Sequence, residues 1–173
     1  MTWRYAFLII PVMMVAAFLW LKSGSSVPQL SVQNLAQLPV RIQAPYNEAA
    51  NADADIDAAF ARAKASGKWV LIDLGGNWCP DCIVLANVME LPEFKSWLAA
   101  HYEIVTVDVG RFDKNLQVPA RFGLTQRLKG VPTVLIATPD GKLVNDGDPF
   151  TLANATAMSP QAIADWLAQW VVR

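Results

Sequence analysis

The stretch WVLIDLGGNWCPDC, residues 69–82, decides how the rest of this chain is interpreted. Its first six residues are apolar apart from Asp73, which is typical of a short strand buried on both faces. Two glycines interrupt this pattern, and Cys79 and Cys82 follow at the start of a helical sequence. The chain has no other cysteine, so its function depends on what these two thiols do at the end of a buried strand.

The composition is that of one globular domain with additional sequence. The chain has 173 residues, which is too few for two large cores. Hydrophobic residues make up 54% of the chain and the formal net charge is −1. Because no basic surface is evident from this balance, we predict no nucleic-acid partner.

An uncharged apolar run at residues 5–21 lies between Arg4 and Lys22. As a helix it would span roughly 25 Å, just short of a hydrocarbon core of about 30 Å. We therefore expect residues 1–22 to be a signal anchor that contacts the membrane through residues 5–21, or a signal peptide that is removed. Either version exports the rest of the chain to an oxidising compartment.

Residues 23–50 are rich in Ser, Gln, Pro and Asn, which predicts a linker. Apolar residues such as Leu35 and Leu38 leave room for some packing on the domain surface. The folded domain is expected over residues 51–173.

Within this domain helical and strand patterns alternate, which indicates an α/β sandwich with parallel strands and a final hairpin. The first expected elements are a helix capped by Asp53 or Asp55 and ended by Gly67, a strand at Trp69–Leu74, a helix from the cysteines to near Pro92, and a second helix holding Phe94, Trp97 and Leu98. The later ones are a strand at Glu103–Val109, a helix near Leu116–Phe122, two strands within Val131–Val144 joined by a turn at Pro139–Gly141, and a last helix opened by Ser159 and Pro160.

A metal site and a structural staple both fit the two cysteines poorly. Structural zinc takes four ligands, whereas the chain offers one cysteine pair and a single histidine, His101, which we interpret as a solvated residue. We therefore predict no metal. A disulfide that closes a two-residue loop restrains little of the unfolded chain, which disfavours a passive staple.

A redox role has positive support. Cys79 lies between a strand and a helix, where unpaired backbone N–H groups favour the reactive thiolate. Cys82, one turn later, lies on the same side and can close a disulfide with Cys79. Pro80 suits the first helical position because its missing N–H is not needed there.

The combination of WVLIDLGGNWCPDC with GVPTVLI at residues 130–136 resembles the thioredoxin family, in particular its exported bacterial members, over roughly Ile56–Arg173. The resemblance implies a thioredoxin fold, which is α/β with a mixed central sheet and helices on both faces. It also implies a place at the bacterial inner membrane facing the periplasm, or in the periplasm if the leader is cleaved.

The resemblance assigns roles to three residues. Cys79 matches the exposed nucleophile that attacks a substrate disulfide, and Cys82 matches the more buried resolving thiol. Asp73 matches the buried acid that takes the proton from the resolving thiol, and burial is expected to raise its pKa toward neutrality. The Cys79–Cys82 disulfide is then the redox group, and no further cofactor is expected.

Four more residues match the family's substrate-binding positions. Trp78 matches the tryptophan beside the nucleophile. Pro132 matches a proline that is cis and lies against the cysteines. Val131 and Thr133 would supply backbone groups that pair with an extended substrate segment.

The pair Pro80-Asp81 replaces the family's commonest central pair, Gly-Pro, and is expected to tune the redox chemistry. At roughly 6–7 Å, repulsion between the Asp81 carboxylate and a Cys79 thiolate is about 0.6–2.5 kcal/mol. Because a less stabilised thiolate makes a better reductant, Asp81 favours reduction.

Two segments also differ in length from thioredoxin. The segment LTQRLKG, residues 124–130, is longer and places Arg127 and Lys129 near the active face. A further loop, residues 145–158, is inserted before the last helix.

We therefore predict a thiol-disulfide oxidoreductase that reduces disulfides of exported proteins and receives electrons from a membrane donor. Two alternatives stay open: a disulfide oxidase or isomerase, and a non-enzymatic binding module with dispensable cysteines. Copper delivery is disfavoured because no Met or His cluster accompanies the cysteines.

Overall fold

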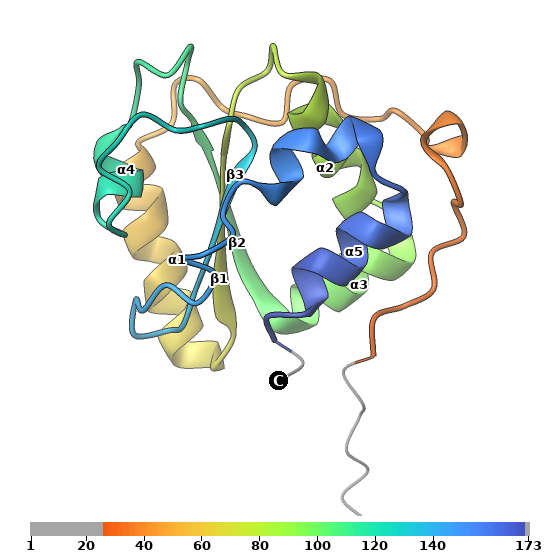
Figure 1. Ribbon diagram of the computed structural model, residues 1–173. Coiled ribbons are helices and arrows are strands. Elements are labelled where there is room, and N and C mark those ends of the chain that lie inside the picture. The colour runs from red at the N-terminus through yellow and green to blue at the C-terminus, as the bar shows by residue number, and fades with distance from the viewer. Residues whose placement is uncertain (1–25, 172–173) are drawn as a thin grey trace, which may run out of the picture.

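The computed structural model describes residues 26–171, which form a three-stranded mixed sheet with helices on both faces (Figure 1). The central strand β1 (Trp69–Gly75) runs parallel to β2 (Tyr102–Asp108) and antiparallel to β3 (Thr133–Ala137). The predicted α/β architecture with a mixed central sheet is confirmed.

The helices divide between the two faces of the sheet (Figure 1). One face carries α1 (Ala52–Ser66) and the short α4 (Gln117–Ala120). The other face carries α2 (Pro80–Met89), α3 (Pro92–His101) and α5 (Pro160–Ala168). Two 3-10 helices complete the described elements, η1 (Leu35–Gln37) and η2 (Thr151–Ala157).

The helix ends follow the predicted signals with one correction. Asn51, and not Asp53 or Asp55, caps α1, because its side chain accepts the Ala54 N–H at 3.1 Å. Gly67 ends α1 at a φ of 75°, a conformation in which glycine has no steric penalty. Ser159 caps α5 as predicted.

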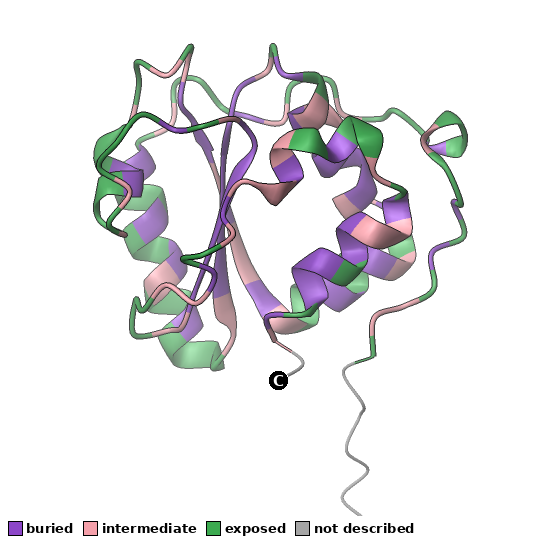
Figure 2. Cartoon of the chain, viewed as in Figure 1, coloured by how far each residue is buried: buried purple, intermediate pink, exposed green. Residues whose placement is uncertain are grey.

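Strand β1 is buried on both faces, as its apolar sequence predicts. Leu71 packs in the core formed with α2, α3 and α5, whereas Ile72 and Leu74 pack in the core on the α1 side. Figure 2 shows buried residues along the strands and on the helix faces turned toward them. The active-site loop thus begins from a rigid strand.

The predicted hairpin after β3 is wrong in its second strand. Within the described chain only one bridge, between Ala137 and Leu143, pairs the two segments. The buried Asn145 side chain accepts the Ile136 N–H and donates to the Val134 carbonyl, both at 2.8 Å. The amide side chain therefore satisfies two backbone groups of β3, and the Ile136 carbonyl accepts the backbone N–H of Val144 at 2.9 Å.

The linker prediction is wrong for the described residues 26–50, which pack on the domain. Leu30, Val32 and Leu38 are buried in the core with α2, α3 and α5. The Asn87 side chain of α2 accepts the N–H groups of residues 41 and 42 at 2.7 and 2.9 Å. We call residues 26–50 the N-terminal strap.

The predicted leader, residues 1–22, lies outside the described residues. Among residues 26–171 no helix has the length and apolar character needed to cross a membrane.

We predict that Val32→Ala lowers the free energy of unfolding by about 1.5–2.5 kcal/mol, because two buried methyl groups are lost. Val40→Ala is the matched control, since Val40 lies in the same strap and is 62% exposed. It should change stability by less than about 0.5 kcal/mol. Urea unfolding of the full chain measures the free energy of unfolding of both variants. If Val32→Ala costs no more than Val40→Ala, the burial of Val32 does not stabilise the fold.

Candidate active site

The two cysteines lie at the junction of β1 and α2. Cys79 is the N-cap residue of α2, and its own N–H donates to the Gly76 carbonyl at 3.0 Å. The Cys79 sulfur accepts the Cys82 N–H at 3.2 Å, so it occupies the place of a capping oxygen. This is the position at the end of a buried strand that the sequence predicts.

The resemblance implies an exposed nucleophile, but Cys79 is buried. Cys79 is 2% exposed and Cys82 is fully buried. Besides accepting from Cys82, the Cys79 thiol donates to the Val131 carbonyl at 3.3 Å. These two bonds hold the Cys79 sulfur inward.

The two thiols differ in acidity. Hydrogen bonding from the Cys82 thiol lowers the pKa of Cys79, burial opposes this, and the negative charge of Asp81 also raises it. The pKa of Cys82 is raised, first by its hydrogen bond to Cys79, then by burial and by the nearby Asp73 carboxylate. Cys79 is therefore the thiol that ionises first and the better nucleophile of the pair.

Asp73 is fully buried in β1, which confirms the placement expected of the family's acid. Burial raises its pKa from 3.8 to about 7, and a hydrogen bond from Tyr46 partly opposes the rise. The Tyr46 hydroxyl donates to one carboxyl oxygen at 2.9 Å. The other oxygen has no hydrogen-bond partner among the described residues and is free to take a proton.

Tyr46 brings the strap into the site, and sequence reasoning missed it. Its backbone N–H donates to Asn77 at 2.9 Å, and its carbonyl accepts from the same side chain at 3.0 Å. A Cβ placed on Gly75 would collide with both the Tyr46 hydroxyl and the Cys82 sulfur, so these two groups lie over the same glycine. The only sequence signal was an aromatic residue within a polar stretch.

The Val131–Pro132 bond is cis, as the family resemblance implies. Val131 is buried against Cys79 through its carbonyl. Thr133 is buried in β3 opposite Leu74, and its hydroxyl donates to the Gly130 carbonyl at 2.6 Å. The structure thus brings Val131 to the cysteines, while Thr133 lies in the sheet.

Trp78 lies at the surface beside the cysteines and is 38% exposed. Its indole N–H donates to the Gly110 carbonyl at 2.8 Å. Phe112 contacts it edge to face at 6.0 Å between ring centroids, and the Arg111 guanidinium lies 4.5 Å from its ring centroid. The tryptophan is therefore fixed by the loop that follows β2.

Asp81 is held by the inserted loop, residues 145–158. One carboxylate oxygen of Asp81 accepts both the backbone N–H and the hydroxyl of Thr156, each at 2.7 Å. Thr156 belongs to η2, which packs against α2. The insertion therefore fixes where the negative charge of Asp81 lies relative to Cys79.

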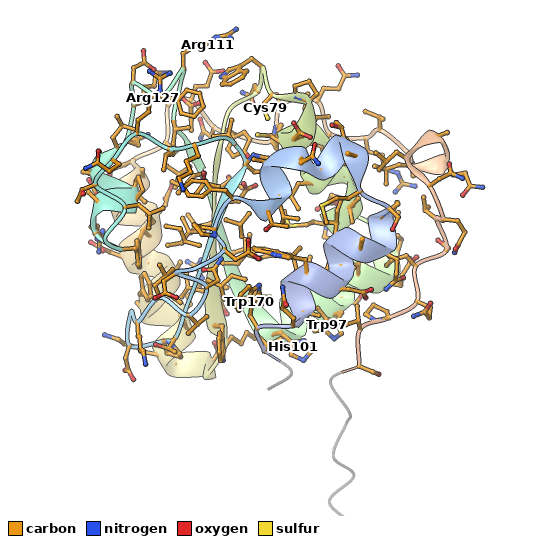
Figure 3. The ribbon with its side chains drawn as sticks, viewed as in Figure 1. Cys79, Trp97, His101, Arg111, Arg127 and Trp170 are labelled. Carbon is orange, nitrogen blue, oxygen red and sulfur yellow. The ribbon has the colours of Figure 1, made fainter. Side chains whose placement is uncertain are left out.

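The other residues singled out from the sequence do not all lie at the site. Arg127 lies 5.1 Å from the Phe112 ring centroid, beside the site, whereas Lys129 lies over Phe150. His101 stacks on Trp97 at the end of the domain opposite Cys79 (Figure 3). The described residues contain no group of three or more His, Cys, Asp or Glu side chains placed to hold a metal.

The family model described as thioredoxin-like matches residues 50–139, which include the cysteine motif and the cis proline. The chain belongs to the thioredoxin-like family. The match begins near the start of α1, so the strap that supplies Tyr46 lies outside it.

Three relatives show what this thioredoxin-like chain is similar to. It is 37% identical over 91 residues to thiol:disulfide interchange protein DsbD 1 of Pseudomonas aeruginosa, which covers 51% of this chain but 14% of that protein. It is 34% identical over 80 residues to thioredoxin of Alicyclobacillus acidocaldarius, covering 46% of this chain and 68% of that protein. The crystal structure of a disulphide isomerase from Xylella fastidiosa matches with a TM-score of 0.68 and 36% identity, over 72% of this chain and 95% of that one.

We predict that Tyr46→Phe raises the pKa of Asp73 above about 7, because the hydrogen bond that lowers it is lost. A net hydrogen-bond contribution of about 0.5–1.5 kcal/mol corresponds to a rise of roughly 0.4–1.1. In the reaction of the reduced protein with a chromogenic aryl disulfide, the second phase reports attack by Cys82. Its rise with pH should move to higher pH by this amount.

Asp73→Asn is the companion variant, and it should slow the second phase near pH 7 and remove its pH dependence around that value. A profile for Tyr46→Phe that coincides with wild type would show that Tyr46 does not set the acidity of Asp73. A fast second phase in Asp73→Asn would show that another base serves Cys82.

We predict that Asp81→Asn lowers the pKa of Cys79 further, because it removes the repelling charge and keeps the oxygen that binds Thr156. The pH dependence of Cys79 alkylation measures it. Asp140→Asn is the control, because this exposed residue lies in the turn after the far end of β3. An unchanged or raised pKa in Asp81→Asn would overturn the electrostatic role.

Proposed function

We propose that this protein is a thiol-disulfide oxidoreductase that reduces disulfides of exported proteins through the Cys79/Cys82 dithiol. The observation that carries the proposal is a pair of thiols whose pKa values move in opposite directions, with a buried acid beside the less acidic one. Pairs of titratable groups with separated pKa values are typical of sites that divide nucleophilic and proton-transfer roles.

Reduction would proceed in two exchanges. The Cys79 thiolate attacks one sulfur of the substrate disulfide, forms a mixed disulfide with it and releases the other sulfur as a thiolate. Asp73 then takes the proton of Cys82, whose thiolate attacks the Cys79 sulfur. The two electrons of the protein dithiol pass to the substrate, which leaves as a dithiol. The protein is left with a Cys79–Cys82 disulfide.

The direction of transfer is supported by electrostatics. The pKa of Cys79 is lowered, first by the hydrogen bond with the Cys82 thiol, and the negative charge of Asp81 limits this lowering and so weakens the stabilisation of the Cys79 thiolate. A dithiol whose thiolate is less stabilised gives up its electrons more readily. The Cys79–Cys82 disulfide would be the redox group, and no further cofactor is needed for the two exchanges.

Isomerisation is the second candidate, because the matched Xylella fastidiosa protein is named a disulphide isomerase. An isomerase uses the same first attack by Cys79, and the substrate's own thiol then resolves the mixed disulfide. The two functions therefore differ in how fast Cys82 competes with the substrate.

The apolar leader and the relatives support a place of action and an electron source for the proposed reductase. The apolar run at residues 5–21 and the similarity to the DsbD protein support export to the periplasmic side of a bacterial inner membrane, tethered or released. A reductant in an oxidising compartment needs electrons from across the membrane, so a membrane electron donor is a proposed partner.

We predict a reduction potential near −270 mV, the value for thioredoxin, measured on the full chain by alkylation mass shift across a graded thiol–disulfide buffer. A value toward −120 mV would mean that the protein oxidises its clients. The absence of any reversible two-electron transition would favour a binding module.

Cys82→Ser separates reduction from isomerisation. This variant should lose turnover as a reductase and accumulate mixed disulfides through Cys79 with exported proteins, whereas an isomerase keeps much of its activity without the resolving thiol. Cys79→Ser is the control and should trap nothing.

A further inference from the structure

We infer that the surface formed by Trp78, Arg111, Phe112 and Arg127 binds an acidic segment flanking the disulfide of a protein substrate. We call these four residues the arginine–aromatic surface. Arg111 and Arg127 lie at the same end of the domain as Cys79 (Figure 3). This recognition presupposes the proposed disulfide reduction and adds to it the chemistry of the substrate.

The loop after β2 is held in a conformation that chains rarely adopt. Phe112 has a φ of 67° and Asn115 a φ of 51°, and a positive φ is a genuine outlier for a bulky side chain. Side chains of the same loop stabilise it: the Asn115 amide donates to the Asp108 carbonyl at 2.8 Å, and Asp113 accepts the Arg111 N–H at 2.8 Å. Backbone strain of this kind clusters at binding and catalytic sites.

The two aromatic rings contact each other, and a guanidinium group lies near each ring. Arg111 lies 4.5 Å from the centroid of Trp78, and Phe112 contacts the edge of Trp78 at 6.0 Å between centroids. Arg127 approaches Phe112 at 5.1 Å from the following segment. The Trp78 indole is also bound to the Gly110 carbonyl, which fixes this ring against the loop after β2.

Both arginines keep their hydrogen-bond donors available. A guanidinium group held over a ring by a cation–π contact can still bind a carboxylate in a bidentate way through its N–H groups. In the described chain neither Arg111 nor Arg127 forms an ion pair, whereas Arg121 pairs with two carboxylates of α1. Two carboxylates lie in the same loop: that of Asp108 pairs with Lys114 at 3.1 Å, and that of Asp113 accepts the backbone N–H of Arg111 at 2.8 Å.

A recess with apolar and polar walls adjoins Arg127. A cavity of about 280 Å³ has Phe112, Arg127 and apolar side chains in its wall, with two polar residues beside them: Leu116, Pro119, Leu124, Leu128, Thr125 and Gln126. Leu116 is 42% exposed, so its side chain is accessible to a partner. The surface therefore fits a segment that presents carboxylates to the arginines and one apolar side chain to the recess.

The test uses three peptides that share one disulfide and one apolar residue and differ only in two flanking residues: Glu, Gln or Lys. Rates of reduction by the reduced full-length protein are measured by stopped flow at low ionic strength. We expect the Glu peptide to react about tenfold faster than the Lys peptide, and the preference to fade at high salt. Arg111→Gln with Arg127→Gln should abolish the preference, and Glu at both positions should invert it.

Arg41→Glu is the matched control, because Arg41 is exposed and its segment is bound to Asn87 of α2. Arg41→Glu lowers the net charge by as much as the double Gln variant does, and it should keep the preference for the Glu peptide. Equal rates for the three peptides, or a preference that survives in the double Gln variant, would overturn the recognition.

The Gln peptide and a binding assay separate this recognition from the proposed function. Failure to reduce the Gln peptide would count against disulfide reduction itself. Peptides with serine in place of cysteine are not reducible, and calorimetry with them measures recognition alone. Tighter binding of the Glu version, lost in the double Gln variant, supports the acidic segment; equal binding of the Glu and Lys versions overturns it.

Discussion

A carboxyl group buried in the central strand is the constraint on which the site depends. Asp73 is fully buried, and burial raises its pKa to about 7 because the charged form loses its hydration. A group in this position needs a polar partner, and the sheet itself offers none. Tyr46 supplies that partner from outside the sheet, and the same hydroxyl lies over Gly75 beside Cys82. The pKa of the resolving thiol, Cys82, therefore depends on the strap that positions Tyr46.

Side-chain amides and carboxylates bind backbone groups of the N-terminal strap and of the segments around the two cysteines. Asn77 binds both backbone groups of Tyr46, and Asn87 binds the strap further along. Asn145 replaces a strand beside β3, which frees the following residues to form the insertion that holds Asp81. Each contact joins segments that lie apart in the sequence, so the environment of the two cysteines is assembled from the whole chain.

The fold was predictable where local signals agree with burial. The apolar run of β1, the cap at Ser159 and the left-handed glycine at Gly67 all appear where the sequence places them. The strap and the hairpin were not predictable in the same way. A polar stretch carries no periodicity, and a single asparagine gives no sign that it will stand in for a strand.

The sequence by itself determined the chemistry: two thiols at the start of a helix, an acid in the strand before them, and a Val-Pro-Thr segment far along the chain, which together indicate the thioredoxin-like family. Only the tertiary structure decided how that chemistry is tuned. The hydrogen bond of Tyr46 to Asp73, the anchoring of Asp81 by Thr156 and the contact of Arg111 with the Trp78 ring are long-range contacts. Spacing along a chain fixes which face of a helix or strand a residue occupies, but it does not fix which distant side chain packs against it.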